Sequence, residues 1–228
     1  MTMLCGLLVL AVRADDSAQS DPLARRTAPA LLAAVETNRE YCRQCNVGQD
    51  FKSLARGAGG LTVLAELVRS QSDDEAWQTA TAKLLAAARA TEAAAKKADA
   101  SAARTSLQQI RDDITALSQL QPSGKPLPLA KPSGGLRNLM YVLEATFADA
   151  KVSLAVDDAE SAKNSAIVLS ELGRLVFNER TDARWQRWSN NYLAAAREAA
   201  SSDATQAAKL RPLFHAISQR CDSCHDKK

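Results

Sequence analysis

Aromatic side chains are scarce in this chain, and methionine and histidine are scarcer still. Phe, Trp and Tyr make up 4% of the 228 residues, and there are three methionines and two histidines. No alternating run of β-branched residues appears and alanine is abundant, which disfavours strands and favours helix nearly everywhere. The formal net charge of +3 comes without a polybasic block, so nucleic acid is not an expected partner. These features predict an all-α fold.

The chain opens with MTMLCGLLVLAVRADD, whose apolar stretch is too short to span a bilayer. The stretch gives way to Val12-Arg13-Ala14 and then to acidic residues, so residues 1–14 are predicted to be a secretory signal peptide. No other apolar segment is long enough to span, and we expect an exported, periplasmic protein with no membrane span. Removing the leader removes Cys5 and leaves four cysteines in two Cys-x-x-Cys pairs.

Short segments of the first half return in the second half in the same order. The pairs are VLAEL (63–67) with VLSEL (168–172), Ala76-Trp77-Gln78 with Arg184-Trp185-Gln186, and LAAAR (85–89) with LAAAR (193–197). The shift of about 105 to 108 residues predicts an internal duplication with a small insertion. A segment with four of the seven prolines separates the copies and is predicted to be a linker over 121–135. The expected domains are 27–120 and 136–228.

Each copy divides into four helical stretches with short connections, which predicts two tandem antiparallel four-helix bundles. The first helix is expected to begin at Thr27, just before Pro29. Pro212 is expected to bend the last helix. The predicted N-caps are Asp50, Asp73 or Asp74, Asp157 or Asp158, Thr181 or Asp182, and Ser202 or Asp203.

The chain closes with the run Cys221-Asp222-Ser223-Cys224-His225. Two thiols at this spacing reach both vinyl groups of a haem, and an imidazole immediately after them can ligate the iron. A zinc ion needs four ligands, and the adjacent Cys224 and His225 are awkwardly placed for one tetrahedral ion. A plain redox dithiol has no use for the histidine. In an exported chain the run therefore favours a covalent haem over the zinc and dithiol alternatives.

A set of four helices that ends in AISQRCDSCHDKK resembles the class II c-type cytochromes, which comprise the cytochrome c-prime family and its low-spin, methionine-ligated relatives. The resemblance covers the second copy only. It implies one haem c bound through Cys221 and Cys224, with His225 as the proximal iron ligand. The matching segment of the first copy, RDDITALSQL, has neither Cys nor His, so that copy is predicted to be free of haem.

Met140 is the only thioether outside the leader. In an up-down-up-down bundle it lies about 7 Å into its helix, at the end that carries the haem motif. We predict that it is the second axial ligand, and the alternative is a core side chain among neighbouring leucines. His215 lies too far back on the motif's own helix to bind the opposite face of the haem. Arg220 is predicted to pair with a haem propionate, or else to be an ordinary solvated arginine.

Two axial ligands leave no vacancy at the iron, which predicts an electron carrier that serves redox partner proteins, and not an enzyme. The alternative is a five-coordinate, cytochrome c-prime-like protein that binds or senses NO or CO, in which Met140 only walls a distal pocket. A third possibility, from another class, is an interaction or structural protein whose haem bundle only supports the first copy.

The other cysteine pair, Cys42 and Cys45, precedes Asn46 where a haem motif has histidine. It falls near the predicted turn between the first two helices. We expect a disulfide or two thiols there, ahead of a degenerate haem anchor or a zinc site shared with the C-terminal pair. Proteins that resemble this family often pair through helix faces, so the two copies are expected to pack as an internal pseudo-dimer. The alternative is two bundles on a semi-rigid string.

Overall fold

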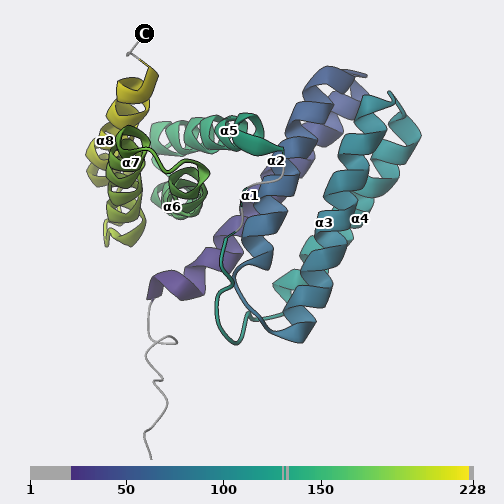
Figure 1. The fold of residues 1–228 in the computed structure, drawn as a ribbon, viewed down its shortest axis with the longest axis horizontal. Coiled ribbons are helices and arrows are strands. Elements are labelled where there is room, and N and C mark those ends of the chain that lie inside the picture. The colour runs from purple at the N-terminus through teal and green to yellow at the C-terminus, as the bar shows by residue number, and fades with distance from the viewer. Residues whose placement is uncertain (1–21, 130, 132–133, 226–228) are drawn as a thin grey trace, which may run out of the picture.

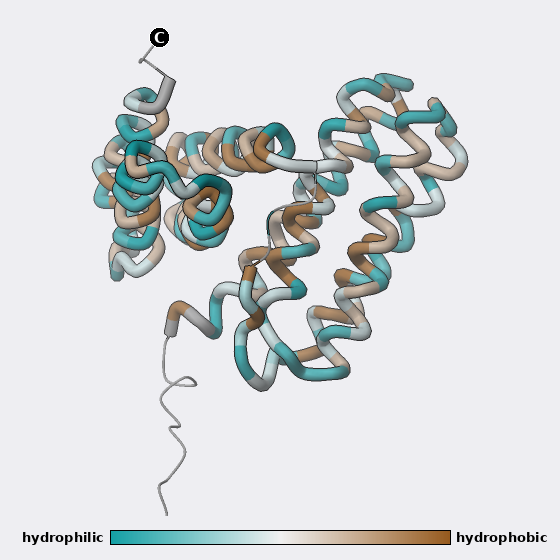
Figure 2. Tube along the Cα trace, viewed as in Figure 1, coloured by the Kyte–Doolittle hydropathy of each residue, from teal (hydrophilic) through white to brown (hydrophobic). Residues whose placement is uncertain are grey.

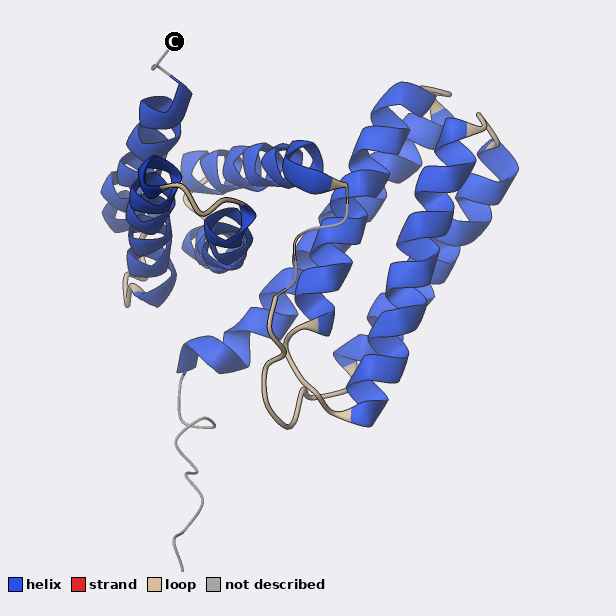
Figure 3. Cartoon of the chain, viewed as in Figure 1, coloured by secondary structure: helices blue, strands red, loops and turns tan. Residues whose placement is uncertain are grey.

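The described part of the protein consists of eight α-helices (Figures 1 and 3). The computed structural model describes residues 22–129, 131 and 134–225, and these residues contain no strand, so the predicted all-α fold is confirmed. The predicted leader, residues 1–14, lies outside the described residues. None of the described helices has the length and apolar character needed to cross a membrane. The helices are α1 (Pro22–Val47), α2 (Phe51–Arg69), α3 (Glu75–Lys96), α4 (Ala100–Ser118), α5 (Gly135–Ala155), α6 (Ala159–Glu179), α7 (Ala183–Ser201) and α8 (Ala207–His225).

Helices α1 to α4 lie side by side as a four-helix bundle (Figure 1). Aspartate caps begin three of them, because the carboxylates of Asp50, Asp74 and Asp99 accept hydrogen bonds from backbone N–H groups three residues on. Helix α2 is apolar on nearly all sides, since α1, α3 and the N-terminal part of α5 all pack on it.

Helices α5 to α8 form the second half, in which the first and last helices meet at only a few residues. The rings of Phe147 and Phe214 lie 6.2 Å apart, and Arg211 donates to the Leu154 carbonyl at 3.0 Å. In Figure 1, α5 runs across the direction of α8 instead of along it. This differs from the predicted up-down-up-down arrangement.

The reason lies in the contact between the halves, which holds the start of α5 on the first bundle. Gly59 and Gly60 of α2 have no Cβ, and the side chains of Asn138 and Val142 occupy the space where a Cβ would lie. Two helices can approach closely where one presents glycine. The position of α5 is therefore set by α2 as much as by its own half.

The halves meet reciprocally, because α1 contacts α6 while α2 contacts α5. Arg26 on α1 forms an ion pair with Glu160 on α6 at 2.9 Å, and the Tyr41 and Tyr141 rings lie 6.4 Å apart. One continuous cluster of buried apolar side chains runs through both halves. Figure 2 shows apolar segments along all eight helices, with the polar segments interleaved. The two halves thus share one core.

A tryptophan corner recurs in the two halves. The Trp77 indole Nε1 donates to the Val68 carbonyl at 2.9 Å, and the Trp185 indole Nε1 donates to the Val176 carbonyl at 2.7 Å. Each residue of the second corner lies 108 positions after its counterpart. Each indole bridges the end of one helix and the start of the next.

Glutamines beside the tryptophans repeat the pattern. Gln78 Nε2 donates to the Arg69 carbonyl at 2.8 Å, and Gln186 Nε2 donates to the Phe177 carbonyl at 2.8 Å. The same spacing of 108 relates the caps Asp50 and Asp158. The VLAEL and VLSEL segments are 105 positions apart and so lie about one helical turn out of this spacing. The predicted insertion is not needed between these corners.

Two predicted helix boundaries are wrong. Helix α1 begins at Pro22, not at Thr27, and continues through Pro29. Figure 1 shows a bend near its start, as expected where proline removes one N–H from the helix ladder. Ser202 ends α7 instead of capping α8, which begins at Ala207.

The described part of the proline-rich segment between α4 and α5 is attached to the corner between α2 and α3. Asp73 N–H donates to the Lys125 carbonyl at 2.8 Å, and Lys125 N–H donates to Asp73 Oδ1 at 2.8 Å. Leu127 N–H donates to the Ser70 carbonyl at 2.8 Å. The segment therefore connects the two halves and is also hydrogen-bonded to the first half.

Gly124 is required for this attachment, and we expect a Gly124→Ala substitution to loosen it. Its φ of +86° is strained for any L side chain, and a Cβ there would collide with Asp73 Oδ1. The substitution should lower the free energy of unfolding by about 1–3 kcal/mol and speed amide hydrogen exchange at Lys125 and Leu127. Gly48→Ala is the control, since its Cβ would meet only ordinary contacts. Unchanged exchange at Lys125 in the Gly124→Ala chain would contradict the prediction.

Candidate functional site

The candidate site is the last turn of α8, which carries the Cys-x-x-Cys-His run. Helix α8 extends to His225, so its backbone places positions 221, 224 and 225 at helical spacings of three and four on one face. The side chains of Cys224 and His225 lie outside the described residues. The helix thus presents the three positions of the motif together.

Cys221 continues the buried stripe of α8. Leu210, Phe214 and Ile217 are buried at successive turns of this helix, and Cys221 is half-buried one turn further on. Burial, with a smaller electrostatic contribution from Cys221, raises the pKa of the Tyr192 hydroxyl on α7. The thiol therefore faces the interior of the second half and not open solvent.

Trp188 on α7 fixes the end of α8. Its indole Nε1 donates to the Arg220 carbonyl at 2.6 Å, and its ring stacks on Tyr192 at a centroid distance of 6.0 Å. The Arg220 side chain itself is exposed. Trp188 was not predicted from the sequence as part of the site. The signal that could have identified it is its position three residues after Trp185, which places both indoles on one face of the same helix.

A hollow of about 710 Å³ lies between the start of α7 and the last turn of α8. Its lining combines basic and aromatic side chains with a few polar ones, namely Arg180, Asp182, Ala183, Arg184, Trp185, Arg187, Trp188, Asn191 and Ser223. No α5 residue is among this lining, so Met140 does not border the hollow within the described part.

Met140 is half-buried on α5 and packs against the shared core. It lies two turns before Phe147 on the same helix face, and Phe147 touches Phe214 of α8. Cys221 lies two turns beyond Phe214. Because α5 runs across α8, the first turns of α5 and the last turn of α8 lie in different directions from this shared contact (Figure 1). His215 is exposed, with Nε2 3.1 Å from the Gln219 amide nitrogen.

The second cysteine pair lies inside α1 and not at a turn. Cys42 is fully buried, Cys45 is half-buried, and the two sulfurs are not joined. Cys42 Sγ fills the space above Gly57, where a Cβ would lie only 2.7 Å away, and burial raises the pKa of its thiol. Asn46 uses its amide to donate to the Ala100 carbonyl at 3.1 Å. Among the predicted alternatives, the structure has two thiols that pack in the core.

The described side chains hold no group of three His, Cys, Asp or Glu residues that could bind a metal ion. The end of α8 has features that suit a haem, because three motif positions share one helix face and that face continues an apolar stripe. Cationic and aromatic side chains lie beside it, and they suit a flat apolar group with acidic substituents. Comparisons with protein-family models, with curated proteins and with solved structures give no match to this chain.

Proposed function

We propose that this protein is an exported mono-haem c-type cytochrome that carries electrons between partner proteins in the periplasm. The observation that carries the proposal is the placement of the Cys-x-x-Cys-His run on the last turn of α8, where Cys221 is half-buried and packs against the core. In the proposal, Cys221 and Cys224 hold the haem through thioether bonds. A haem c supplies one-electron redox chemistry when it is bound.

The proposed iron ligands are His225 and Met140. The helical spacing of His225 from Cys221 supports the first, since the imidazole follows both thiols on one face. The second is proposed because Met140 is the only methionine outside the predicted leader, and it shares a face of α5 with Phe147, whose ring lies 6.2 Å from that of Phe214 on α8. Because α5 runs across α8, ligation by Met140 requires the start of α5 to approach the end of α8.

The optical spectrum of the purified protein tests the ligand pair. We expect a six-coordinate, low-spin iron with a sulfur-to-iron charge-transfer band. Met140→Ala should abolish that band and let the ferrous protein take up carbon monoxide at once, because the sixth position is then open. Leu143→Ala, one turn away on the same helix, is the control and should keep the band. If the parent protein is high-spin and binds carbon monoxide immediately, the gas-binding alternative holds instead.

We also propose that the fold arose by duplication of one four-helix unit and that the two copies pack as an internal pseudo-dimer. The tryptophan corners at a constant spacing of 108 support the duplication. The reciprocal contacts of α1 with α6 and of α2 with α5 have the pattern of a two-fold interface. In the first copy, Ile114 and Leu117 take the places of the motif cysteines and pack in the core, which leaves no haem anchor there.

A further inference from the structure

The strongest unexplained feature is a set of exposed arginines around the end of α8. We define the arginine face as Arg180, Arg184 and Arg187, which line the hollow beside Trp188, together with Arg220, whose main-chain carbonyl accepts the Trp188 indole hydrogen bond. All four side chains are exposed, and none forms an ion pair within the part of the chain that the structure describes. Arg180 lies over the Trp185 ring at 4.9 Å. Their charges are thus available to a partner.

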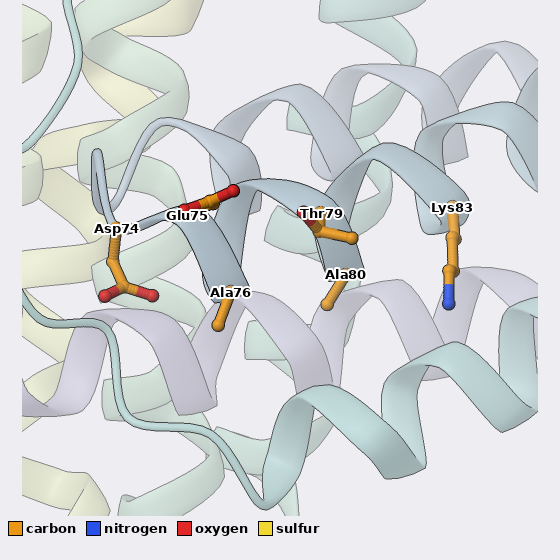
Figure 4. A pocket seen from close by; sticks show the side chains of 6 residues that line it. All are labelled: Asp74, Glu75, Ala76, Thr79, Ala80 and Lys83. Atoms are coloured by element: carbon orange, nitrogen blue, oxygen red, sulfur yellow. The ribbon is translucent and has the colours of Figure 1, made fainter.

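The first half provides an internal reference for this face. A second hollow, on α3, is lined by residues at the corresponding positions, and Figure 4 shows its side chains Asp74, Glu75, Ala76, Thr79, Ala80 and Lys83. At the spacing of 108, Ala76 corresponds to Arg184, Thr79 to Arg187 and Ala80 to Trp188.

The other two arginines also have no basic counterpart in the first half. Ser72 corresponds to Arg180 at the spacing of 108, and Asp113 corresponds to Arg220 at a spacing of 107. The cap is common to both halves as Asp74 and Asp182, so the local fold is the same. The four arginines are therefore found only in the half that has the haem motif. The tryptophan corner forms in the first half without them.

We propose that the arginine face is the docking surface for an acidic partner protein, which exchanges electrons beside the end of α8. The inference rests on the proposed electron-carrier function. Charge complementarity identifies the occupant, because carboxylates pair with guanidinium groups in a bidentate way. The acidic residues next to these arginines in the chain are Asp182, whose carboxylate caps α7, the exposed Asp222 and the half-buried Glu179, so the four exposed arginines outnumber them.

A protein surface is favoured over a lipid surface. Membrane-binding faces combine basic residues with exposed large apolar side chains. The exposed large apolar residues of the described part lie on or beside α1, α4 and α5 and not on this face; they are Tyr41, Val47, Leu120, Val152 and Val156. Trp188 is half-buried and its indole N–H is occupied by Arg220.

A charge-reversal experiment tests the proposal on the full chain. Binding of an oligoglutamate peptide is followed by tryptophan fluorescence in the parent, in an Arg184→Glu/Arg187→Glu chain, and in an Arg104→Glu/Arg111→Glu chain. The control arginines are exposed on α4, and the two double variants have the same net charge. We expect the first double variant to raise the Kd by about tenfold or more, and the control to change it by less than about twofold.

Equal losses in the two variants would overturn the proposal, since binding would then follow net charge alone. Binding of phosphatidylserine vesicles that depends on Arg184 and Arg187, without peptide binding, would also overturn it in favour of a membrane surface. Haem staining of the same preparation separates the two hypotheses. If the protein stains for haem but does not bind the peptide selectively, only the docking surface is rejected. If the protein binds the peptide selectively but does not stain for haem, the electron-carrier function is rejected, and with it the redox partner.

Discussion

A chain with Cys221→Ala and Cys224→Ala is expected to lose its covalently bound haem completely. Positions 221 and 224 lie on the face of α8 that continues the buried stripe, whereas the other two described cysteines, Cys42 and Cys45, lie on α1. The substituted chain should run without haem stain on a denaturing gel. Its second half should also be loosened, because the porphyrin would no longer pack against the end of α8.

The matched control is Cys42→Ala/Cys45→Ala, which removes the other Cys-x-x-Cys pair. That chain should keep the full haem stain, although it should be less stable, because Cys42 is fully buried. If haem colour stays with the chain after substitution of Cys221 and Cys224, the attachment site is elsewhere and the proposed function fails in its present form. Loss of colour only in the control would move the anchor to α1.

Trp77→Ala is expected to lower the free energy of unfolding by about 3–5 kcal/mol, among the largest effects of any single substitution in the chain. Trp77 is 1% exposed, and its indole N–H holds the Val68 carbonyl at the end of α2. The substitution leaves a cavity and an unsatisfied carbonyl in the same place. Urea unfolding followed by far-UV circular dichroism measures the loss.

Trp77→Phe reduces the cavity contribution, because the phenyl ring fills most of the space of the indole but has no N–H donor. Its expected cost is about 1–2 kcal/mol. The continuous core also predicts that parent and variants unfold in one transition. A Trp77→Ala chain in which the first half melts separately, while the transition of the second half is unshifted, would show that the halves are energetically independent.

Local features of this fold could be predicted from the sequence because they depend on residues three or four apart. Asp50, Asp158 and Asp182 were predicted as N-caps, and each accepts a hydrogen bond from the N–H three residues on. The prediction for the start of α1 is wrong because proline is typical of a first helical turn, whereas α1 contains Pro29 in its interior and bends there.

Long-range features could not be predicted in this way. The path of α5 across α8 depends on the glycines of α2, which lie more than seventy residues earlier in the chain. The bond from Trp188 to the Arg220 carbonyl joins residues on two different helices. The cysteine motif is contiguous and could be recognised from the sequence. The arginines at the start of α7 lie beside it only because the fold brings α7 and the last turn of α8 together.

The tryptophan corner has a consequence for how such proteins diverge. Its indole and amide donors bind main-chain carbonyls, so the residues that provide those carbonyls are free to change without loss of the bond. Val68 and Arg69 in one half are Val176 and Phe177 in the other. What must persist is Asp-x-x-Trp-Gln-x-x followed by Thr or Ser, as in Asp74 to Thr81 and Asp182 to Ser189. We expect a distant relative that has lost every cysteine to carry this pattern once in each half.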